Sequence, residues 1–458
     1  MEQPRRSLFT TKSLILLMVP IMAETLLAQL VGMMDGIMVS SVGEVAISAV
    51  SLVTNFSAVI INLLTALATG GSIVTSQLIG AGRDEKARRS TGQVITMTFM
   101  VSVVIGILCI TFSKPLLMLV FGKVEASVLK DAVTYFTYDA ASYPLLALCA
   151  AGGAIKRSRG DSKTMFYISI LRNLINIAGN AICIFGLKMG VAGVAIPTVI
   201  SRLVGACILM YLVNKKSNKH RPDARDIFQI NPKLMGKMLR IGFPTAIENS
   251  MFQLGRLLTL SMISGFGTAE IAGNSTANAL CALVVTFSSA VRIGTMNVIG
   301  QCVGARDEQQ IKTNFRKLMI MSYIAYGAAA IAMIILRKPL VGLYTGLSPE
   351  AAQLATELIL IHMIPGIFIY ALSFYIVSPL RAANDGAYCM WVSVLSMAIF
   401  RLTLAQILCV NLGWGAKGVY CAMVVDWVCR SICLTIRWYS GAWKKKCNLI
   451  PQETTQTT

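Results

Sequence analysis

Long apolar runs alternate along the chain with short polar stretches that are rich in Lys and Arg. A helix needs about 20 apolar residues to cross the hydrocarbon core of a membrane, and the runs are of this length or longer. The pattern predicts an all-α membrane protein with twelve transmembrane helices, near residues 13–39, 46–80, 91–113, 128–155, 164–186, 190–214, 234–264, 269–303, 315–336, 349–380, 387–410 and 415–440. The first run is too long, and is followed by too many others, to be a cleaved signal peptide.

Composition and charge agree with this pattern. Hydrophobic residues make up 55% of the chain and charged residues 14%, so most of the surface must face lipid. Most of the 41 Lys and Arg lie in segments on the same side of the membrane as the N-terminus, which marks that side as cytoplasmic. We therefore expect both termini in the cytoplasm. The net charge of +20 then reflects topology and contact with anionic lipid head groups, not binding to nucleic acid.

The second half of the chain repeats the first. Each residue of the first half has a counterpart 224 positions later, as in Pro20 with Pro244, Glu24 with Glu248, Gly43 with Gly267, Arg157 with Arg381 and Asp161 with Asp385. Near the end the offset slips by one, where Gly190 and Gly193 match Gly415 and Gly418. Such duplication is typical of transporters built from two halves. Six helices return the chain to its starting side, so we expect parallel repeats about a pseudo-twofold axis along the membrane normal.

The duplication predicts the domain boundaries. We expect an N-lobe over residues 1–213 with helices one to six, and a C-lobe over 234–440 with helices seven to twelve. The longest polar segment, 214–233, is expected to be the cytoplasmic linker between the lobes, and 441–458 a cytoplasmic tail.

Two acids fall inside the first apolar run. Glu24 and Asp35 are eleven residues apart, about three helical turns, so both project from nearly the same face. A carboxylate inside a membrane is costly and usually marks a path for ions or substrate. Structural hydrogen bonding remains an alternative interpretation for Glu24. Gly70, Gly71, Gly80 and Gly304 are interpreted as close-packing positions or helix ends.

No pattern typical of an enzyme is visible. Eleven of the twelve cysteines lie inside apolar runs, where they act as small packing residues. The two histidines, His220 and His362, complete no metal site or catalytic triad. We expect a protein that is not an enzyme and that needs no cofactor or metal apart from a coupling Na⁺.

The chain resembles the multidrug and toxic compound extrusion (MATE) transporters, of the multidrug/oligosaccharidyl-lipid/polysaccharide flippase superfamily. The resemblance lies in the helix from Pro20 to Asp35, QLIGAG at 77–82, QCVGAR at 301–306 and NLINIAGNAICIFG at 173–186. It implies two six-helix bundles, alternating access, and export of drugs or other amphiphilic organic compounds coupled to Na⁺ or H⁺. It further implies a multi-pass protein of the cell (inner or plasma) membrane, in contact with lipid and small-molecule substrate, and a monomer. Alternatives are a lipid-linked oligosaccharide flippase of the same superfamily and a membrane-embedded enzyme or receptor.

The resemblance also implies a cation-coupling site in the N-lobe. Its positions are matched by Asp35, by Asn176 and Asn180 one turn apart, and by the Thr198 hydroxyl with the Val194 carbonyl. All supply the oxygen ligands that a hard cation prefers. Some relatives carry an aspartate at Asn180, so the choice between Na⁺ and H⁺ stays open. Hydrogen bonds that merely join helices are the alternative for both asparagines.

The C-lobe departs from the family pattern. Tyr370 stands where the sodium-coupled bacterial branch has an aspartate, although His362 and Asp426 are possible titrating groups. The expected substrate cavity comprises Glu24, Glu248, Gln253, Arg256, Arg292 and Tyr370. If Arg256 and Arg292 line it, anionic or zwitterionic substrates would be favoured over purely cationic ones. Alternatively, Glu248 neutralises Arg256 and a helix C-terminus satisfies Arg292.

Overall fold

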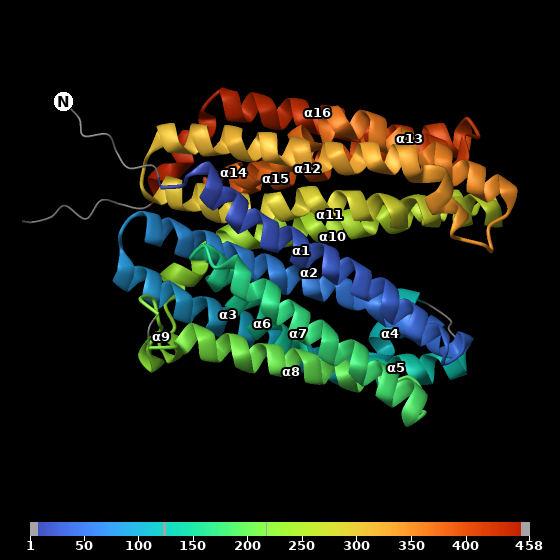
Figure 1. Cartoon of the computed structure of the whole chain (residues 1–458), viewed down its shortest axis with the longest axis horizontal. Coiled ribbons are helices and arrows are strands. Elements are labelled where there is room, and N and C mark those ends of the chain that lie inside the picture. Colours follow the sequence, from blue (N-terminus) through green and yellow to red (C-terminus); the bar gives the residue numbers. More distant parts are fainter. Residues whose placement is uncertain (1–7, 122–124, 217, 450–458) are drawn as a thin grey trace, which may run out of the picture. The chain divides into compact units, whose positions relative to one another are not determined.

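The structure is a computed structural model that describes residues 8–121, 125–216 and 218–449 (Figure 1). Every regular element in these ranges is a helix, and the chain is an all-α membrane protein. The helices of the first half are α1 (Thr11–Ser40), α2 (Glu44–Gly80), α3 (Asp84–Thr111), α4 (Ser113–Phe121), α5 (Ala126–Ala141), α6 (Tyr143–Ser158), α7 (Ser162–Ala181) with the π-helical turn η1 (Ile182–Gly186), α8 (Ala192–Asn214) and α9 (Ala224–Phe228).

The second half consists of α10 (Pro232–Ser264), α11 (Thr268–Gly304), α12 (Glu308–Gly342), α13 (Pro349–Tyr370), η2 (Ala371–Tyr375), α14 (Val377–Ala382), α15 (Gly386–Ser396), η3 (Met397–Thr403), η4 (Gln406–Asn411), α16 (Gly415–Tyr439) and η5 (Ala442–Leu449). The segments η2, η3 and η4 are π-helical and continue the α-helices beside them, whereas η5 is a 3₁₀ helix.

Within the described ranges, ten helical segments are long and apolar enough to cross a membrane. The predicted span at 128–155 is instead two helices of 16 residues, α5 and α6, which meet at Ser142. Pro144 fits the start of a new helix here, because it cannot donate a backbone hydrogen bond and lies in the first turn of α6, where the N–H would have no partner within the helix. The span predicted at 234–264 falls in α10, which has 33 residues but is less apolar. The total of twelve spans therefore remains a prediction.

The backbone repeats the duplication seen in the sequence. Helices α2 and α11 both have 37 residues and begin 224 positions apart. The left-handed turns recur as well: residues with positive φ pair as Gly43 with Gly267, Gly82 with Arg306, Gly160 with Asn384, Lys188 with Gly413 and Gly190 with Gly415. The first three pairs keep the offset of 224 and the last two have an offset of 225, as the sequence predicts. The same connections therefore link equivalent helices in both halves.

Two compact units divide the chain inside α10. The first unit runs from Ile15 to Ser250, and the second begins at Met251 and also contains the described residues before Ile15. Each unit has its own apolar core: α2, α5 and α8 supply much of the first, and α11, α12, α13 and α16 much of the second. The lobes, linker and tail expected from the sequence remain a prediction.

The segment between the two predicted lobes is held against the first unit by hydrogen bonds to α3. The Gln93 amide nitrogen donates to the carbonyl oxygens of Asp226 and Gln229, at 2.7 and 2.8 Å, and its oxygen accepts from the Asn231 backbone N–H at 2.8 Å. Thr96 donates to the Ile227 carbonyl oxygen. Residues 226–231 are therefore docked along α3.

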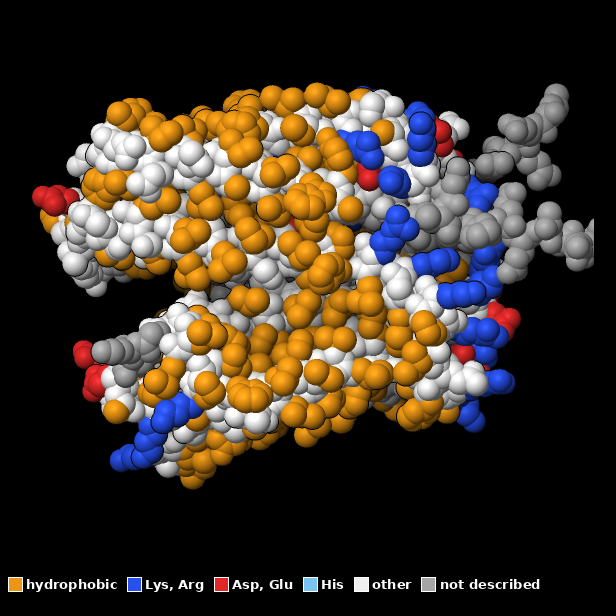
Figure 2. Space-filling model, turned by 180° about the vertical axis from the view of Figure 1, so that it is seen from behind, with side chains coloured by type: hydrophobic (Ala, Val, Ile, Leu, Met, Phe, Trp, Pro, Cys, Tyr) orange, Lys and Arg blue, Asp and Glu red, His pale blue; other side chains and the backbone are white. Residues whose placement is uncertain are grey.

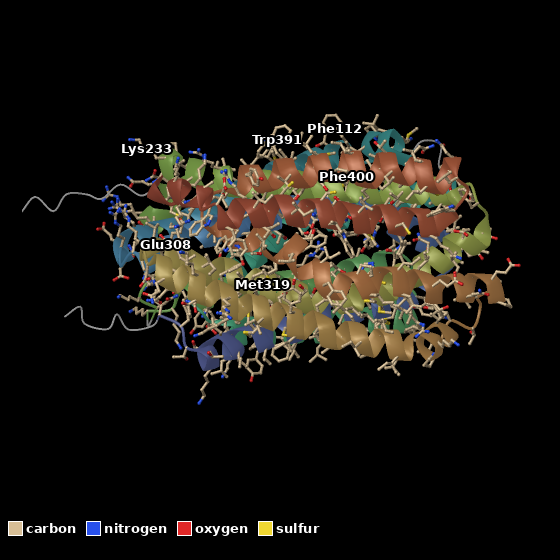
Figure 3. All side chains as sticks on the ribbon, turned by 90° about the horizontal axis from the view of Figure 1, so that it is seen from above. Phe112, Lys233, Glu308, Met319, Trp391 and Phe400 are labelled. Atoms are coloured by element: carbon tan, nitrogen blue, oxygen red, sulfur yellow. The ribbon has the colours of Figure 1, made fainter. Side chains whose placement is uncertain are left out.

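Apolar side chains cover much of the visible surface of both units, and Lys and Arg gather mainly near helix ends (Figure 2). Phe112 and Trp391, labelled in Figure 3, are 50% and 58% exposed. Exposed rings of this size are costly in water and fit contact with lipid. Glu308, also labelled, binds Lys312 at 2.7 Å and Lys444 at 2.6 Å at the start of α12.

Close packing explains two of the glycines singled out in the sequence. A Cβ atom at Gly70 would overlap the backbone of α10 at Met238 and would lie 2.7 Å from the Gly242 nitrogen. A Cβ at Gly71 would overlap the Val94 side chain of α3. Helix α2 therefore contacts α3 and α10 through its glycines, as predicted. Gly80 and Gly304 are the last residues of α2 and α11, which confirms the interpretation as helix ends.

Candidate functional site

The five residues expected to bind the coupling ion form one chain of hydrogen bonds in the first unit. The Asn180 amide nitrogen on α7 donates to Asp35 Oδ1 on α1 at 3.0 Å and to Asn176 Oδ1 at 3.4 Å. The Asn176 amide donates to Thr198 Oγ1 on α8 at 3.1 Å, and this hydroxyl donates to the Val194 carbonyl oxygen at 3.0 Å. The structure thus brings together residues that are up to 163 positions apart in the sequence.

Local packing places these groups side by side. Asn176 and Asn180 lie one turn apart on the buried face of α7, at 7% and 1% exposure. Gly179 lies between them, and a Cβ there would come within 2.7 Å of the Pro197 ring on α8. The missing side chain lets α7 approach α8 closely enough for Asn176 to reach Thr198.

The donor set suits a monovalent cation or a proton. It offers one carboxylate, two amide oxygens, a hydroxyl and a backbone carbonyl, and hard cations prefer such oxygens. Asn180 Oδ1 is buried and has no hydrogen-bond partner, although nearly all buried polar atoms in proteins have one. This oxygen is therefore available as a ligand. Asp35 is the one acid in the set, so a single positive charge neutralises it.

The second half of the chain serves as an internal control for this cluster. The counterparts of Asp35, Asn176 and Asn180, 224 positions later, are Thr259, Phe400 and Leu404, and the counterparts of Val194 and Thr198, 225 positions later, are Val419 and Met423. Phe400 lies on η3 (Figure 3). The second half thus lacks the polar chain at the equivalent positions. Hydrogen bonding between helices remains the alternative interpretation of Asn176 and Asn180.

Glu24 has a partner that the sequence reasoning missed. Its Oε1 lies 3.5 Å from the Arg157 guanidinium in the last turn of α6, and both side chains are less than one-fifth exposed. Glu24 Oε2 is buried without a hydrogen bond. The pair holds α1 against α6 in the first unit. The repeat could have indicated this pair, because both of its residues recur in the second half. Glu248 lies 224 positions after Glu24, and Arg381 lies 224 positions after Arg157.

A second buried ion pair in the first unit was also not predicted. Asp139 Oδ1 accepts from Arg202 at 2.7 Å, and Asp139 Oδ2 accepts from Ser57 at 2.6 Å. Arg202 also donates to Ser142, at the break between α5 and α6. The two charges compensate each other, and Arg202 is hydrogen-bonded both to α5 and to Ser142 at the break, which makes this a structural pair. The sequence could have indicated this pair, because Asp139 and Arg202 are opposite charges inside two different apolar runs.

The structure places the predicted C-lobe residues in an aromatic core. Tyr370 is 6% exposed and stacks on Tyr326 and Phe374, with ring centroids 4.5 and 4.4 Å away. The His362 ring meets the Trp427 ring edge to face at 4.9 Å, and its Nε2 is buried without a hydrogen bond. Tyr370 therefore packs as an aromatic side chain within the core of the second unit.

Asp426 and Arg430 form the ion pair that their spacing on one helix predicts. Both are completely buried on α16, with Asp426 Oδ2 at 3.6 Å from Arg430 Nη2. The other carboxylate oxygen, Oδ1, accepts a hydrogen bond from Ser396.

The residues expected to line the substrate cavity fall in both units. Glu24 and Glu248, which is buried, belong to the first unit. Gln253, Arg256, Arg292 and Tyr370 belong to the second, where Arg256 is exposed and Gln253 and Arg292 are half-buried. A cavity shared by all six stays a prediction.

Comparison with known proteins identifies related chains. The MatE family model matches residues 20–182 and 244–407, one segment in each half. The chain is 29% identical over 445 residues to the uncharacterized transporter YisQ of Bacillus subtilis (strain 168), with 95% of this chain and 96% of YisQ covered. It is 25% identical over 449 residues to the probable multidrug resistance protein NorM of Thermotoga maritima, with 95% and 93% covered.

The fold is similar to that of a solved structure described as the outward-facing conformation of a multidrug resistance MATE family transporter of the MOP superfamily. The TM-score is 0.89 at 20% sequence identity, with 95% of this chain and 97% of that chain covered.

Proposed function

The chain belongs to the MATE family of membrane transporters, and we propose on this premise that it exports amphiphilic organic compounds in exchange for Na⁺ or H⁺. The observation that carries the proposal is the chain of hydrogen bonds from Asp35 to Val194, with its buried unpartnered oxygen on Asn180. The cluster lies within helices that otherwise are apolar enough to span a membrane, where a lone carboxylate needs compensation.

Asp35 is proposed to carry the charge that the coupling ion neutralises. A cation bound there would be shared by α1, α7 and α8, because Asp35, Asn180 and Thr198 come from these three helices. Its release would remove the shared ligand and leave α1 held to α7 by one hydrogen bond to Asn180. Binding and release therefore change how firmly α1 is attached to the first unit, which supplies a link between the ion and the conformation.

We further propose the setting in which this exchange takes place. The transporter acts as a monomer in the cell (inner or plasma) membrane with both termini in the cytoplasm, since the basic segments gather on that side. The lobes 1–213 and 234–440 are the parts that alternate the access of a small-molecule substrate, and no nucleic acid takes part.

The test removes the charge of Asp35 with little change in shape. In proteoliposomes, Asp35→Asn should lower gradient-driven export of a fluorescent amphiphile by at least about tenfold, the expected scale for one lost charge-assisted interaction. Na⁺ and pH gradients are imposed separately, so that the parental protein also identifies the coupling ion. Glu44→Gln, which removes an exposed acid at the start of α2, is the matched control. Export by Asp35→Asn at the parental rate under both gradients would show that the ion site is assigned wrongly.

A further inference from the structure

The second unit buries a group of polar atoms that have no hydrogen-bond partners. They belong to what we call the arginine–aromatic cluster, made of His362, Arg401, Tyr420, Trp427 and Arg430 with the acid Asp426. The buried atoms without partners are Nε2 of His362, Nε of Arg401, the hydroxyl of Tyr420, Nε1 of Trp427, Nη1 and Nη2 of Arg430, and Oδ2 of Asp426. Nearly all buried polar atoms in proteins are hydrogen-bonded, so a concentration of exceptions needs an explanation.

Arg430 is the centre of the cluster. Its guanidinium is completely buried, stacks over the Phe374 ring at 4.1 Å and lies 5.0 Å from the Phe252 ring. Nε donates to Ser373 Oγ at 2.9 Å, which leaves the N–H groups of Nη1 and Nη2 without acceptors. The two rings and Ser373 fix the plane of the guanidinium. Its Nη1–Nη2 edge has Asp426 Oδ2 at 3.6 Å from Nη2 but makes no hydrogen bond, and such an edge has the geometry that binds a carboxylate through two parallel hydrogen bonds.

The charges of the cluster do not balance. Arg401 interacts electrostatically with Arg430, with Asp426 and with Arg256, which is exposed on α10. Arg401 and Arg430 thus both interact with the carboxylate of Asp426, and Arg256 adds a third positive charge near Arg401. Asp426 Oδ2 lies 3.6 Å from Arg430 Nη2 without a hydrogen bond to it. Donors without partners also outnumber acceptors. The missing component is an anionic group with several acceptor atoms.

The internal repeat shows that the scaffold does not need these residues. The first-half counterparts of Arg256, Arg401 and Arg430 are Gly32, Ile177 and Gly205, and the equivalent helices fold with them. The first half buries an arginine elsewhere, Arg202, where Asp139 compensates it. Arg430 is completely buried at a position where the first half has glycine, and because buried arginine is expensive in a membrane, its presence there indicates a specific role.

We infer that the arginine–aromatic cluster is the subsite that receives the carboxylate of the substrate, so that the protein transports amphiphilic carboxylates, as anions or zwitterions, in preference to purely cationic compounds. This inference rests on the proposed export function. The aromatic rings of Phe374 and Trp427 supply the apolar wall for the rest of the substrate. Arg430 is completely buried in the described conformation, whereas Arg401 is half-buried. Entry of a substrate carboxylate to Arg430 therefore requires the rings over it to move, and Arg256 supplies positive charge at the surface. The structure moves the centre of this anion site from the predicted Arg256 and Arg292 to Arg401 and Arg430.

Two dyes that differ only in a carboxylate test the inference. Rhodamine B carries a free carboxylate and is zwitterionic, whereas its ethyl ester has the same rings and is a cation. Binding of each dye to the purified protein is measured by fluorescence polarisation without any ion gradient. We expect the wild-type protein to bind rhodamine B about tenfold more tightly than the ester, the scale of one charge-assisted hydrogen-bonded pair.

Three variants assign the preference to the cluster. Arg401→Gln and Arg256→Gln remove charge, and Arg430→Lys keeps the charge but loses the bidentate edge. Each should bring the affinities for the two dyes close to equality, whereas Arg316→Gln, an exposed basic residue on α12 of the same unit, should keep the wild-type ratio. Because Arg256 is exposed, Arg256→Gln should fold even if a substitution at a buried arginine prevents folding, and it then still tests the dye preference. A wild-type protein that binds the ester at least as tightly as rhodamine B would overturn the inference, as would a preference that survives in all three variants.

The same dyes separate this inference from the proposed function. Asp35→Asn should keep the binding preference while it loses gradient-driven export of rhodamine B. If the wild-type protein shows the preference but no gradient drives export, the export proposal fails and the subsite stands. Coupled export of both dyes at equal rates and equal affinities would leave the export proposal standing and overturn the subsite.

Discussion

Asn180 determines the geometry of the candidate ion site, because its one amide contacts both Asp35 and Asn176. Its nitrogen is used twice as a donor, and its oxygen is the buried atom left without a partner. An amide can fill this role because it donates to a carboxylate while it keeps an oxygen free for a cation. A leucine of similar volume has neither atom, and the second half of the chain has Leu404 at the equivalent place.

This equivalence predicts the result of Asn180→Leu. Export coupled to an ion gradient should fall by at least about tenfold, because the cation loses a ligand and Asp35 loses its donor. The free energy of unfolding should change by no more than about 1 kcal/mol, since hydrogen bonds between membrane helices contribute little and leucine fits the apolar surroundings. Export in proteoliposomes and thermal unfolding in detergent measure the two effects. Unfolding at room temperature would mean that Asn180 is structural after all.

At the scale of helices, glycine sets how closely α2 approaches α10. A Cβ at Gly70 would overlap the backbone of α10, and backbone atoms cannot rotate away as a side chain can. By contrast, a Cβ at Gly236, also on α10, would meet no atom within 4 Å. The two glycines are therefore a matched pair for separating packing from helix propensity.

We predict that Gly70→Ala lowers the free energy of unfolding by about 1–3 kcal/mol, the usual result of overpacking. Gly236→Ala should leave it unchanged or raise it by up to about 1 kcal/mol, because alanine favours the helix more than glycine does. Intrinsic tryptophan fluorescence during thermal unfolding in detergent measures both. Equal effects of the two substitutions would contradict the packing interpretation.

At the scale of the whole chain, the duplication constrains topology. Each half is expected to contain six spans, an even number, so equivalent residues of the two halves must face the same side of the membrane. The excess of Lys and Arg predicts that the N-terminus lies inside. Glu44 and its counterpart Thr268, which begin α2 and α11, are then both outside, and Glu85 and its counterpart Gln309 are both inside.

Single cysteines at these four positions test the topology. All four residues are exposed, and the exposed native thiols of Cys207 and Cys433 can be replaced by serine. A membrane-impermeant maleimide added to intact cells should label positions 44 and 268, and should label 85 and 309 only after permeabilisation. Labelling of 44 and 268 from opposite sides would rule out parallel repeats.

The sequence alone determined the features that depend on residues close together or at a constant spacing. Apolar runs predict the helices because each span must bury its own backbone hydrogen bonds in lipid, and this requirement is local. The offset of 224 predicted the repeated turns, since a left-handed residue such as Gly160 or Asn384 depends mainly on its own neighbours. The candidate ion-site residues from Asp35 to Thr198 were predicted from a family resemblance carried by the same kind of ordered spacing.

The tertiary structure decided which distant groups meet. The partners of Glu24 and Asp139 lie on other helices, and no spacing within one helix specifies them. The break at Ser142 splits a run that hydropathy presents as continuous, because hydropathy does not register how a proline interrupts backbone hydrogen bonds. The structure also leaves Nε of Arg401 and both Nη atoms of Arg430 buried without hydrogen bonds, because whether an arginine is compensated depends on acceptors from helices far away in the chain.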